Sequence, residues 1–250
     1  MDNTPDTLRR GPVPDWDLPV GVDRGLWDYL ASEEMVNGYD NQMAVSPLAA
    51  TDVKFCEAAL PQPGRLIDLG CGTGRLCVHF ARRGFDCLGV DLSELMLAKS
   101  AANAKSAGVR VEFRRENLVD LAGIPDASFD YAACLFSTLG MIRGNENREA
   151  ALRSAARVVK PGGTLVLHAH NRGFRGLGWK RFLSPEITTR QAYGGAPLTL
   201  RHFTRNEINR LLFATGWQMF EVMSIGIDDR PPRGGGRTYG FLFAARRQVS

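Results

Sequence analysis

Residues 66–74, with the sequence LIDLGCGTG, constrain the fold of this chain more than any other stretch. An apolar run leads through an acid into three glycines at alternate positions, which predicts a buried parallel strand that turns sharply into a helix. Residues 87–91, CLGVD, form a second apolar run that also ends in an acid. Two such strand ends, one with a glycine turn and one with an acid, predict a nucleoside site at the edge of an open α/β sheet.

The spacing of the glycines helps to decide which nucleoside the site takes. A dinucleotide fingerprint needs a small residue where this chain has Arg75. Asp68, two residues before the first glycine, would repel a pyrophosphate and attract an ammonium group. A nicotinamide-dependent oxidoreductase is therefore disfavoured. A tight turn without any ligand would not require both Asp68 and Asp91.

This pattern resembles the class I S-adenosylmethionine-dependent methyltransferases, and the resemblance extends over roughly residues 36–250. Residues 129–140, FDYAACLFSTLG, are similar to that family's fourth strand and the turn after it. Residues 160–167, KPGGTLVL, are similar to its fifth strand, and residues 202–217 to the segment before its sixth. The resemblance implies S-adenosylmethionine as methyl donor, S-adenosylhomocysteine as product, a Rossmann-like fold and no metal.

The alternation of apolar runs with helical patterns predicts an α/β fold. We expect a doubly wound, mostly parallel seven-stranded sheet with helices on both faces. The expected strands are 65–69, 86–90, 109–114, 129–134, 163–169, 217–225 and 238–246. The resemblance implies that the last strand is antiparallel. Helices are predicted from Ser93 to Gly108, near 146–159, and after Thr204, which has capping-box spacing to Glu207.

The chain divides into three expected parts. Residues 1–20, with four prolines, are predicted to be an irregular lead-in, and residues 21–60 a helical lid broken near 37–38 and 46–47. Residues 61–250 form the S-adenosylmethionine-binding methyltransferase domain. Within it, residues 171–203 are expected to be a small β insertion before strand six, with a hairpin between 186–193 and 197–203, that covers the substrate.

The resemblance also implies roles for individual residues at the cofactor. Asp68 would hold the ammonium group, Asp91 both ribose hydroxyls, and Asn117 the adenine amino group through its amide oxygen. The glycines would let the backbone approach the methionine portion, while apolar side chains flank the adenine. Tyr39 would reach the carboxylate end, although a half-buried core tyrosine explains it equally well. The expected set is Tyr39, Asp68, Gly70, Cys71, Gly72, Gly74, Asp91, Leu92, Met96, Asn117, Leu118 and Cys134.

Methyl transfer from a sulfonium mainly requires that the acceptor is aligned and water excluded, so a base matters only when the acceptor must lose a proton. His168 and His170 end strand five, and His170 is the candidate base. Strand alternation places both on one face, which need not be the face of the cleft. A satisfied polar residue at a strand end is the favoured alternative for His170.

The charge of the insertion bears on the acceptor. Residues 171–201 carry six basic residues and one acid, which gives +5 within a chain of net charge +4. Such a basic and aromatic lid favours an anionic small molecule or a nucleic acid, whereas a solvated hairpin with long basic side chains is an equal alternative. The expected substrate contacts are Phe136, Arg172, Tyr193 and Arg201.

Bulk properties exclude some classes of protein. No apolar run is long enough to span a membrane, and the acidic, proline-containing start lacks the pattern of a signal peptide. Five cysteines without a Cys-x-x-Cys pair predict reduced thiols in a cytoplasmic protein. We therefore expect no membrane partner, and the sequence leaves the oligomeric state open.

Three functions are compatible with these features. The favoured one is a transferase acting on a small metabolite. The second is an RNA or tRNA-nucleoside methyltransferase, which would need the charge of the insertion to join a continuous basic surface. The third is a non-catalytic S-adenosylmethionine-binding protein.

Overall fold

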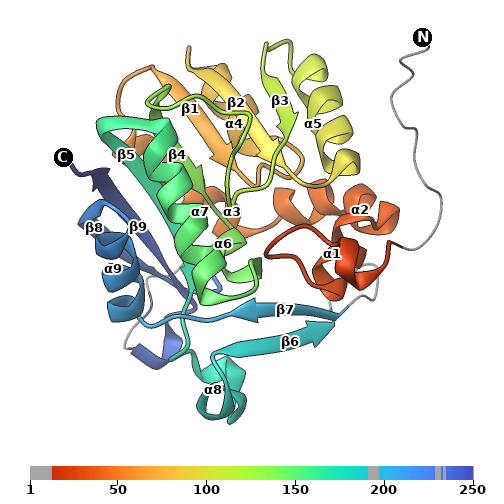
Figure 1. Ribbon diagram of the computed structural model, residues 1–250, viewed down its shortest axis with the longest axis vertical. Coiled ribbons are helices and arrows are strands. Elements are labelled where there is room, and N and C mark those ends of the chain that lie inside the picture. Colours follow the sequence, from red (N-terminus) through yellow and green to blue (C-terminus); the bar gives the residue numbers. More distant parts are fainter. Residues whose placement is uncertain (1–12, 191–196, 229–231, 233–234, 250) are drawn as a thin grey trace.

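Seven strands form one sheet in the order β3-β2-β1-β4-β5-β9-β8 (Figure 1). The computed structural model describes residues 13–190, 197–228, 232 and 235–249. The strands of this sheet are β1 (Arg65–Leu69), β2 (Asp86–Asp91), β3 (Glu112–Arg115), β4 (Phe129–Cys134), β5 (Val159–His170), β8 (Trp217–Ile225) and β9 (Gly240–Arg247). Strands β1 to β5 pair in parallel, while β9 runs antiparallel to both β5 and β8. The predicted doubly wound sheet with an antiparallel last strand is confirmed.

The two faces of the sheet each bury an apolar layer. Successive residues of a strand point to opposite faces, so Leu66 and Ile67, both fully buried, belong to different core clusters. Leu66 packs with α3 (Pro47–Ala59) and α4 (Arg75–Ala81), and α5 (Glu94–Ser106) adds to that side. Ile67 packs with α7 (Asn145–Val158) and α9 (Arg205–Ala214). Because helices cover both faces of the sheet, side chains that can contact a ligand lie at the ends of the strands.

Three helices precede the sheet: α1 (Arg24–Leu30), α2 (Glu33–Ala44) and α3. The predicted break before Pro47 is confirmed, because α3 begins at that proline. The predicted break near residues 37–38 is wrong, since α2 is continuous there and the chain turns at Ser32 instead, whose side chain caps α2. The apolar residues that α2 buries outweigh the low helix propensity of the Asn-Gly pair. Residues 13–20 contain only the 3₁₀ turn η1 (Asp15–Asp17).

The insertion before α9 contains the predicted hairpin. Its strands β6 (Glu186–Arg190) and β7 (Pro197–Arg201) pair antiparallel, apart from the main sheet, and follow η2 (Arg175–Leu177) and α8 (Lys180–Leu183). The hairpin lies against α1 (Figure 1). Gly25 makes this close approach possible, because a Cβ atom there would collide with the carbonyl oxygen of Pro197.

Element boundaries differ from expectation where the backbone bulges. α7 ends at Val158, and β5 begins directly at Val159 rather than at residue 163. Phe129 pairs with Val159 but Tyr131 with Thr164, so residues 160–163 form a bulge.

The predicted start of β3 at residue 109 moves to Glu112. The expected Ser93 cap and the Thr204 capping box are confirmed. The short helix α6 (Thr138–Met141) and the 3₁₀ turn η3 (Gly235–Arg237) complete the elements.

Candidate functional site

A cavity lies at the carboxyl ends of β1, β2 and β4, and the N-terminal segment lines part of it. The space between its lining residues is about 1010 Å³ when the part that is open to solvent is included. Of the residues predicted from the sequence, those that line it are Tyr39, Asp68, Gly70, Cys71, Gly72, Asp91, Leu92, Met96, Asn117, Leu118 and Phe136. The structure thus brings together at one site residues that lie up to 97 positions apart in the chain, from Tyr39 to Phe136.

The glycine turn leaves bare backbone beside this cavity. Gly70 and Gly72 both have positive φ, at 79° and 53°. A Cβ atom on Gly70 would lie 2.6 Å from Cγ2 of Thr138, and one on Gly72 would lie 3.6 Å from the ring of Tyr39. At Gly70, only glycine combines this conformation with so close an approach; at Gly72 the contact would be ordinary, and the positive φ alone favours glycine.

Gly74 and Cys134 occupy packing positions and are not among the residues that line the cavity. Gly74, at φ 77°, sits where a Cβ atom would lie 2.8 Å from Cβ of Ser100 and 3.0 Å from the ring of Phe113. Its role is the close packing of α4 against α5 and β3. Cys134 is a buried core residue at the end of β4.

Asp91 is held in place by the glycine turn. Its Oδ2 accepts a hydrogen bond of 2.9 Å from the backbone N–H of Gly72, and its Oδ1 one of 2.9 Å from that of Ser93. Burial raises the pKa of Asp91, while these N–H donors act to lower it. Each carboxylate oxygen keeps further acceptor capacity, so Asp91 can bind two more donors in the cavity.

Asp68 lies at the base of the cavity with only 3% of its surface exposed. Burial raises the pKa of this carboxyl to about 7, against the lowering effect of Arg75 and of a hydrogen bond from the Cys77 thiol. Arg75 is near enough to act on this carboxyl, but no direct ion pair to Asp68 is found among the described residues, so a ligand cation that contacts the carboxylate would stabilise it.

Arg75 is a site residue that the sequence alone did not indicate. It lines the cavity, donates a 2.9 Å hydrogen bond to the carbonyl of Ala49, and lies over the Phe136 ring with 5.4 Å between guanidinium and ring centre. The only sequence signal was its place as the first helical residue after the glycine turn. This position brings a fixed positive charge close to Asp68.

Asn117 connects the cavity wall to the N-terminal segment. Its Nδ2 donates to the carbonyl of Val20 over 3.0 Å, and its Oδ1 accepts from the N–H of Val119 over 3.1 Å. The amide oxygen can still accept one more hydrogen bond. The segment that Asn117 holds supplies wall residues that were not expected from the sequence, namely Val20, Gly21, Val22, Leu26, Tyr29 and Leu30.

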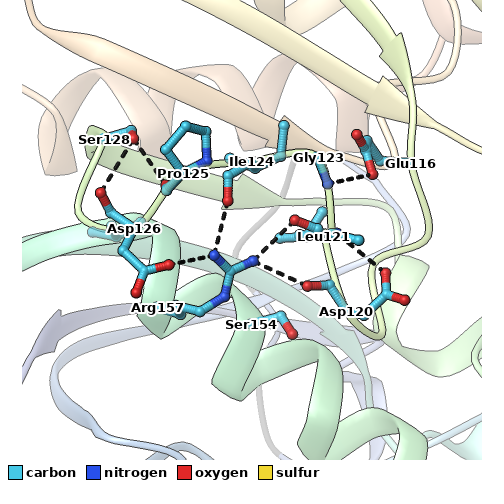
Figure 2. Close-up of polar contacts among 12 residues, drawn as sticks. Glu116, Asp120, Leu121, Gly123, Ile124, Pro125, Asp126, Ser128, Ser154 and Arg157 are labelled. Carbon is cyan, nitrogen blue, oxygen red and sulfur yellow. Dashed lines mark hydrogen bonds and ion pairs between the residues drawn. The ribbon is translucent and has the colours of Figure 1, made fainter.

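Arg157 on α7 fixes the loop that follows β3 (Figure 2). Its guanidinium donates to the carbonyl oxygens of Asp120, Leu121 and Ile124, and it pairs with the carboxylate of Asp126. This loop begins with the cavity residues at positions 117–119, so one partly exposed arginine on the helix layer positions that wall.

The turn after β4 is strained. Phe136 and Ser137 both adopt positive φ, at 51° and 59°, which non-glycine residues rarely do. The hydroxyl of Ser137 accepts a 2.8 Å hydrogen bond from the N–H of His170, which holds the turn against β5. Strain of this kind is concentrated at functional sites.

The candidate base His170 lies behind this turn and is not among the residues that line the cavity. It is buried, with its ring centre 5.5 Å from those of His168 and His202 and 4.7 Å from that of Tyr239. Burial, reinforced by the two neighbouring histidines, lowers its pKa well below the ordinary value. His170 is therefore neutral at physiological pH, and its Nδ1 has no hydrogen-bond partner among the described residues.

The expected substrate arginines do not line the cavity. Arg201 pairs with Glu207 over 3.2 Å and lies over the ring of Phe203. Arg172 is also absent from the cavity wall. Tyr193 lies outside the described residues. Of the predicted contacts that fall within the described residues, Phe136 lines the cavity, and Arg172 and Arg201 do not.

Two further features concern the described part of the chain alone. Within it, no group of three His, Cys, Asp or Glu side chains could hold a metal ion. No helix among these residues is both long and apolar enough to cross a membrane.

Comparisons with known proteins agree with the geometry. Residues 66–163 match the family model described as a methyltransferase domain. A ubiquinone biosynthesis O-methyltransferase from Hahella chejuensis is 35% identical over 115 residues, which are 46% of each protein. The chain spans about half the length of the curated relatives it matches.

Solved structures extend the similarity over more of the chain. An S-adenosylmethionine-dependent methyltransferase from Mesorhizobium loti is 25% identical, with a TM-score of 0.63 over 82% of this chain and 100% of that one. A Burkholderia thailandensis 1,6-didemethyltoxoflavin-N1-methyltransferase with bound S-adenosylhomocysteine has the same fold, with 21% identity, a TM-score of 0.63, and 85% and 83% of the two chains covered. The resemblance drawn from the glycine turn and its two acids is confirmed.

Proposed function

We propose that this chain, whose residues 66–163 match the model of a methyltransferase domain, binds S-adenosylmethionine in the cavity and transfers its methyl group to a small molecule. One observation carries the proposal. Asp68, the bare backbone of the glycine turn and Asp91 line a single cavity, which offers one acid for the ammonium group, close backbone for the methionine chain and a second acid for the ribose of this cofactor.

The individual contacts follow from the chemistry of the wall. Asp91 would accept hydrogen bonds from both ribose hydroxyls, with its own position fixed by Gly72 and Ser93. Asp68 would pair with the cofactor's ammonium group, and Arg75 would attract its carboxylate. The adenine would lie among Leu92, Met96, Asn117 and Leu118.

The cofactor supplies an activated methyl group, so the protein has to position the acceptor and exclude water. The N-terminal segment and the helical lid, residues 21–60, would provide this exclusion. His170 would serve as base only for an acceptor that loses a proton; its lowered pKa keeps the imidazole in the form that can take one. Because His170 is not among the residues that line the cavity, an acceptor would have to extend beyond this wall to meet it.

The wall that remains for an acceptor is mainly apolar. Val22, Leu26, Leu30, Met141 and Ile142 line the cavity, whereas the arginines of the insertion do not. This favours a small organic acceptor with an apolar face over the anionic one that the charge of the insertion suggested. The names of the Hahella and Burkholderia proteins also describe methyl transfer to small molecules.

Calorimetric titration with S-adenosylmethionine, S-adenosylhomocysteine and NADPH tests the proposal. We expect both sulfur compounds to bind and NADPH not to bind. Asp91→Ala should weaken binding at least about 100-fold, because two hydrogen bonds to a charged group are lost. Asp86→Ala, at the exposed opposite end of the same strand, is the matched control and should bind normally.

The outcomes separate the alternatives. Binding of NADPH alone, or equal binding by Asp91→Ala and Asp86→Ala, would contradict the site. Cofactor binding without turnover of any acceptor would favour the non-catalytic binding protein. Binding to RNA that falls steeply with salt would favour the nucleic-acid methyltransferase.

A further inference from the structure

The insertion exposes large apolar side chains at the outer end of the molecule. Trp179, Phe182 and Leu183, on and beside α8, are 68%, 73% and 70% exposed. Figure 1 shows α8 beyond the β6–β7 hairpin, on the side away from the main sheet. We refer to residues 175–183 as the α8 tip. Exposed aromatic and aliphatic side chains that are adjacent in this way commonly mark an interaction surface.

The same region is positively charged. The α8 tip contains three basic residues, Arg175, Lys180 and Arg181, and no acid. Arg175 and Lys180 are exposed. The first acid after them, Glu186, is paired with Arg143 over 3.0 Å and with Arg148 over 2.7 Å, so it does not neutralise the tip. The partner of this surface should therefore be anionic as well as apolar.

We propose that the α8 tip docks on the surface of an anionic lipid bilayer. A tryptophan, a phenylalanine and a leucine beside lysine and arginine are the combination that inserts at the headgroup level while the basic groups contact anionic lipids. An RNA surface would use the aromatic rings for stacking but would leave exposed Leu183 without a function. This attachment lies on the membrane and spans nothing, and it revises the sequence-based expectation of no membrane partner.

Attachment at this point would affect the covering of the cavity. β7 packs against α1 at Gly25, and Leu26 of α1 lines the cavity. The docked tip is therefore joined through one hairpin to the segment that covers the proposed acceptor space. This part of the inference rests on the proposed function, whereas bilayer docking itself does not.

Cosedimentation with vesicles tests the docking in the absence of any cofactor. The intact chain should bind vesicles of phosphatidylcholine mixed with phosphatidylglycerol, should bind phosphatidylcholine alone much more weakly, and should be released by high salt. The double variant Trp179→Ser and Phe182→Ser should reduce partitioning at least about tenfold. Lys180→Ser, which keeps the apolar side chains, should reduce it about fivefold.

Matched controls come from exposed phenylalanines elsewhere. Phe213 on α9 and Phe220 on β8 are 70% and 51% exposed, and Phe213→Ser and Phe220→Ser should leave vesicle binding unchanged. The tryptophan emission should shift to shorter wavelength on binding, and the shift should disappear in Trp179→Phe. Each variant is first shown to fold by circular dichroism; if the double variant does not fold, Lys180→Ser and Trp179→Phe decide the test.

Three results would overturn the inference: no binding to the mixed vesicles at low salt, equal loss of binding in the tip and control variants, or binding to single-stranded RNA but not to vesicles. Calorimetry with S-adenosylmethionine keeps this test apart from the proposed function. The tip variants should retain cofactor affinity, and a failure of cofactor binding in the intact chain would leave the vesicle result standing.

Discussion

The buried carboxyl of Asp68 should make the stability of the cofactor-free protein depend on pH. Burial raises the pKa of Asp68 from 3.8 to about 7. The folded state therefore holds this proton more tightly than the unfolded chain, so the contribution is favourable at low pH and is lost as pH rises from about 4 to about 7. At 1.36 kcal/mol per pKa unit, the loss is at most about 4 kcal/mol above pH 7.

Asp68→Asn should remove this loss. The amide has nearly the same shape, carries no charge and can still accept the hydrogen bond from the Cys77 thiol. We expect the variant to be more stable than the wild type by about 2–4 kcal/mol at about pH 8.5, and nearly equal to it at about pH 3. Urea denaturation of both proteins over this range measures the difference, in which the titration of all other groups cancels.

The same substitution should weaken the cofactor site. Without the carboxylate charge, the contact with the ammonium group of S-adenosylmethionine loses about 1.5–3 kcal/mol, or roughly a 10–100-fold change in affinity. The reasoning would be refuted by a stability difference that does not change with pH, or by unchanged cofactor affinity in the calorimeter.

Three further substitutions probe the contacts that hold the site, each by urea denaturation. Arg157→Ala should lower the free energy of unfolding by about 1–3 kcal/mol, because three loop carbonyls lose their donor, and should also lower cofactor affinity. If neither quantity changes, Arg157 does not anchor the loop. Glu186→Gln should cost about 2–3 kcal/mol by leaving the buried Arg148 without a charged partner. Partial burial acts to raise the pKa of Glu186, but Arg148 and Arg143 lower it overall. The stabilisation by this ion pair should therefore be lost as pH falls below about 4.5. An effect of Glu186→Gln that does not change with pH would argue against the ion pair. Thr204→Ala should cost about 1 kcal/mol by removing the capping box of α9, with no effect on cofactor affinity.

Features that depend on local spacing could be predicted from the sequence. The glycine turn and Asp91 were correctly placed together because the ends of adjacent parallel strands meet at one edge. The Thr204 capping box was predictable because two residues three positions apart, Thr204 and Glu207, determine it. The role of Gly74 could not be predicted in this way. It is a packing position because Ser100 and Phe113, from other elements, lie against it.

Features that depend on distant partners were not predictable. Val20 and Leu26 line the cavity because Asn117 and β7 hold their segment, and no periodicity in residues 13–30 indicates this. Arg201 is paired with Glu207 on α9, which lies outside the insertion. The net charge counted within the insertion therefore overstated the positive charge expected at the cavity. His170 was placed on the correct strand, but the row of buried rings around it joins three separate stretches of chain.

The roof of the cavity has a consequence for the kinetics of cofactor exchange. This roof is the segment of residues 20–30 that lines the cavity. Its polar contacts join Val20 to Asn117, Gly21 and Asp23 to Arg143, and Leu30 to Ser93. These contacts can break while the sheet and its helices stay intact, because opening a peripheral segment costs far less than global unfolding. The rate at which cofactor enters and product leaves should then follow the opening of this segment. Substitution of Asn117 would alter residence times while leaving the midpoint of thermal unfolding nearly unchanged.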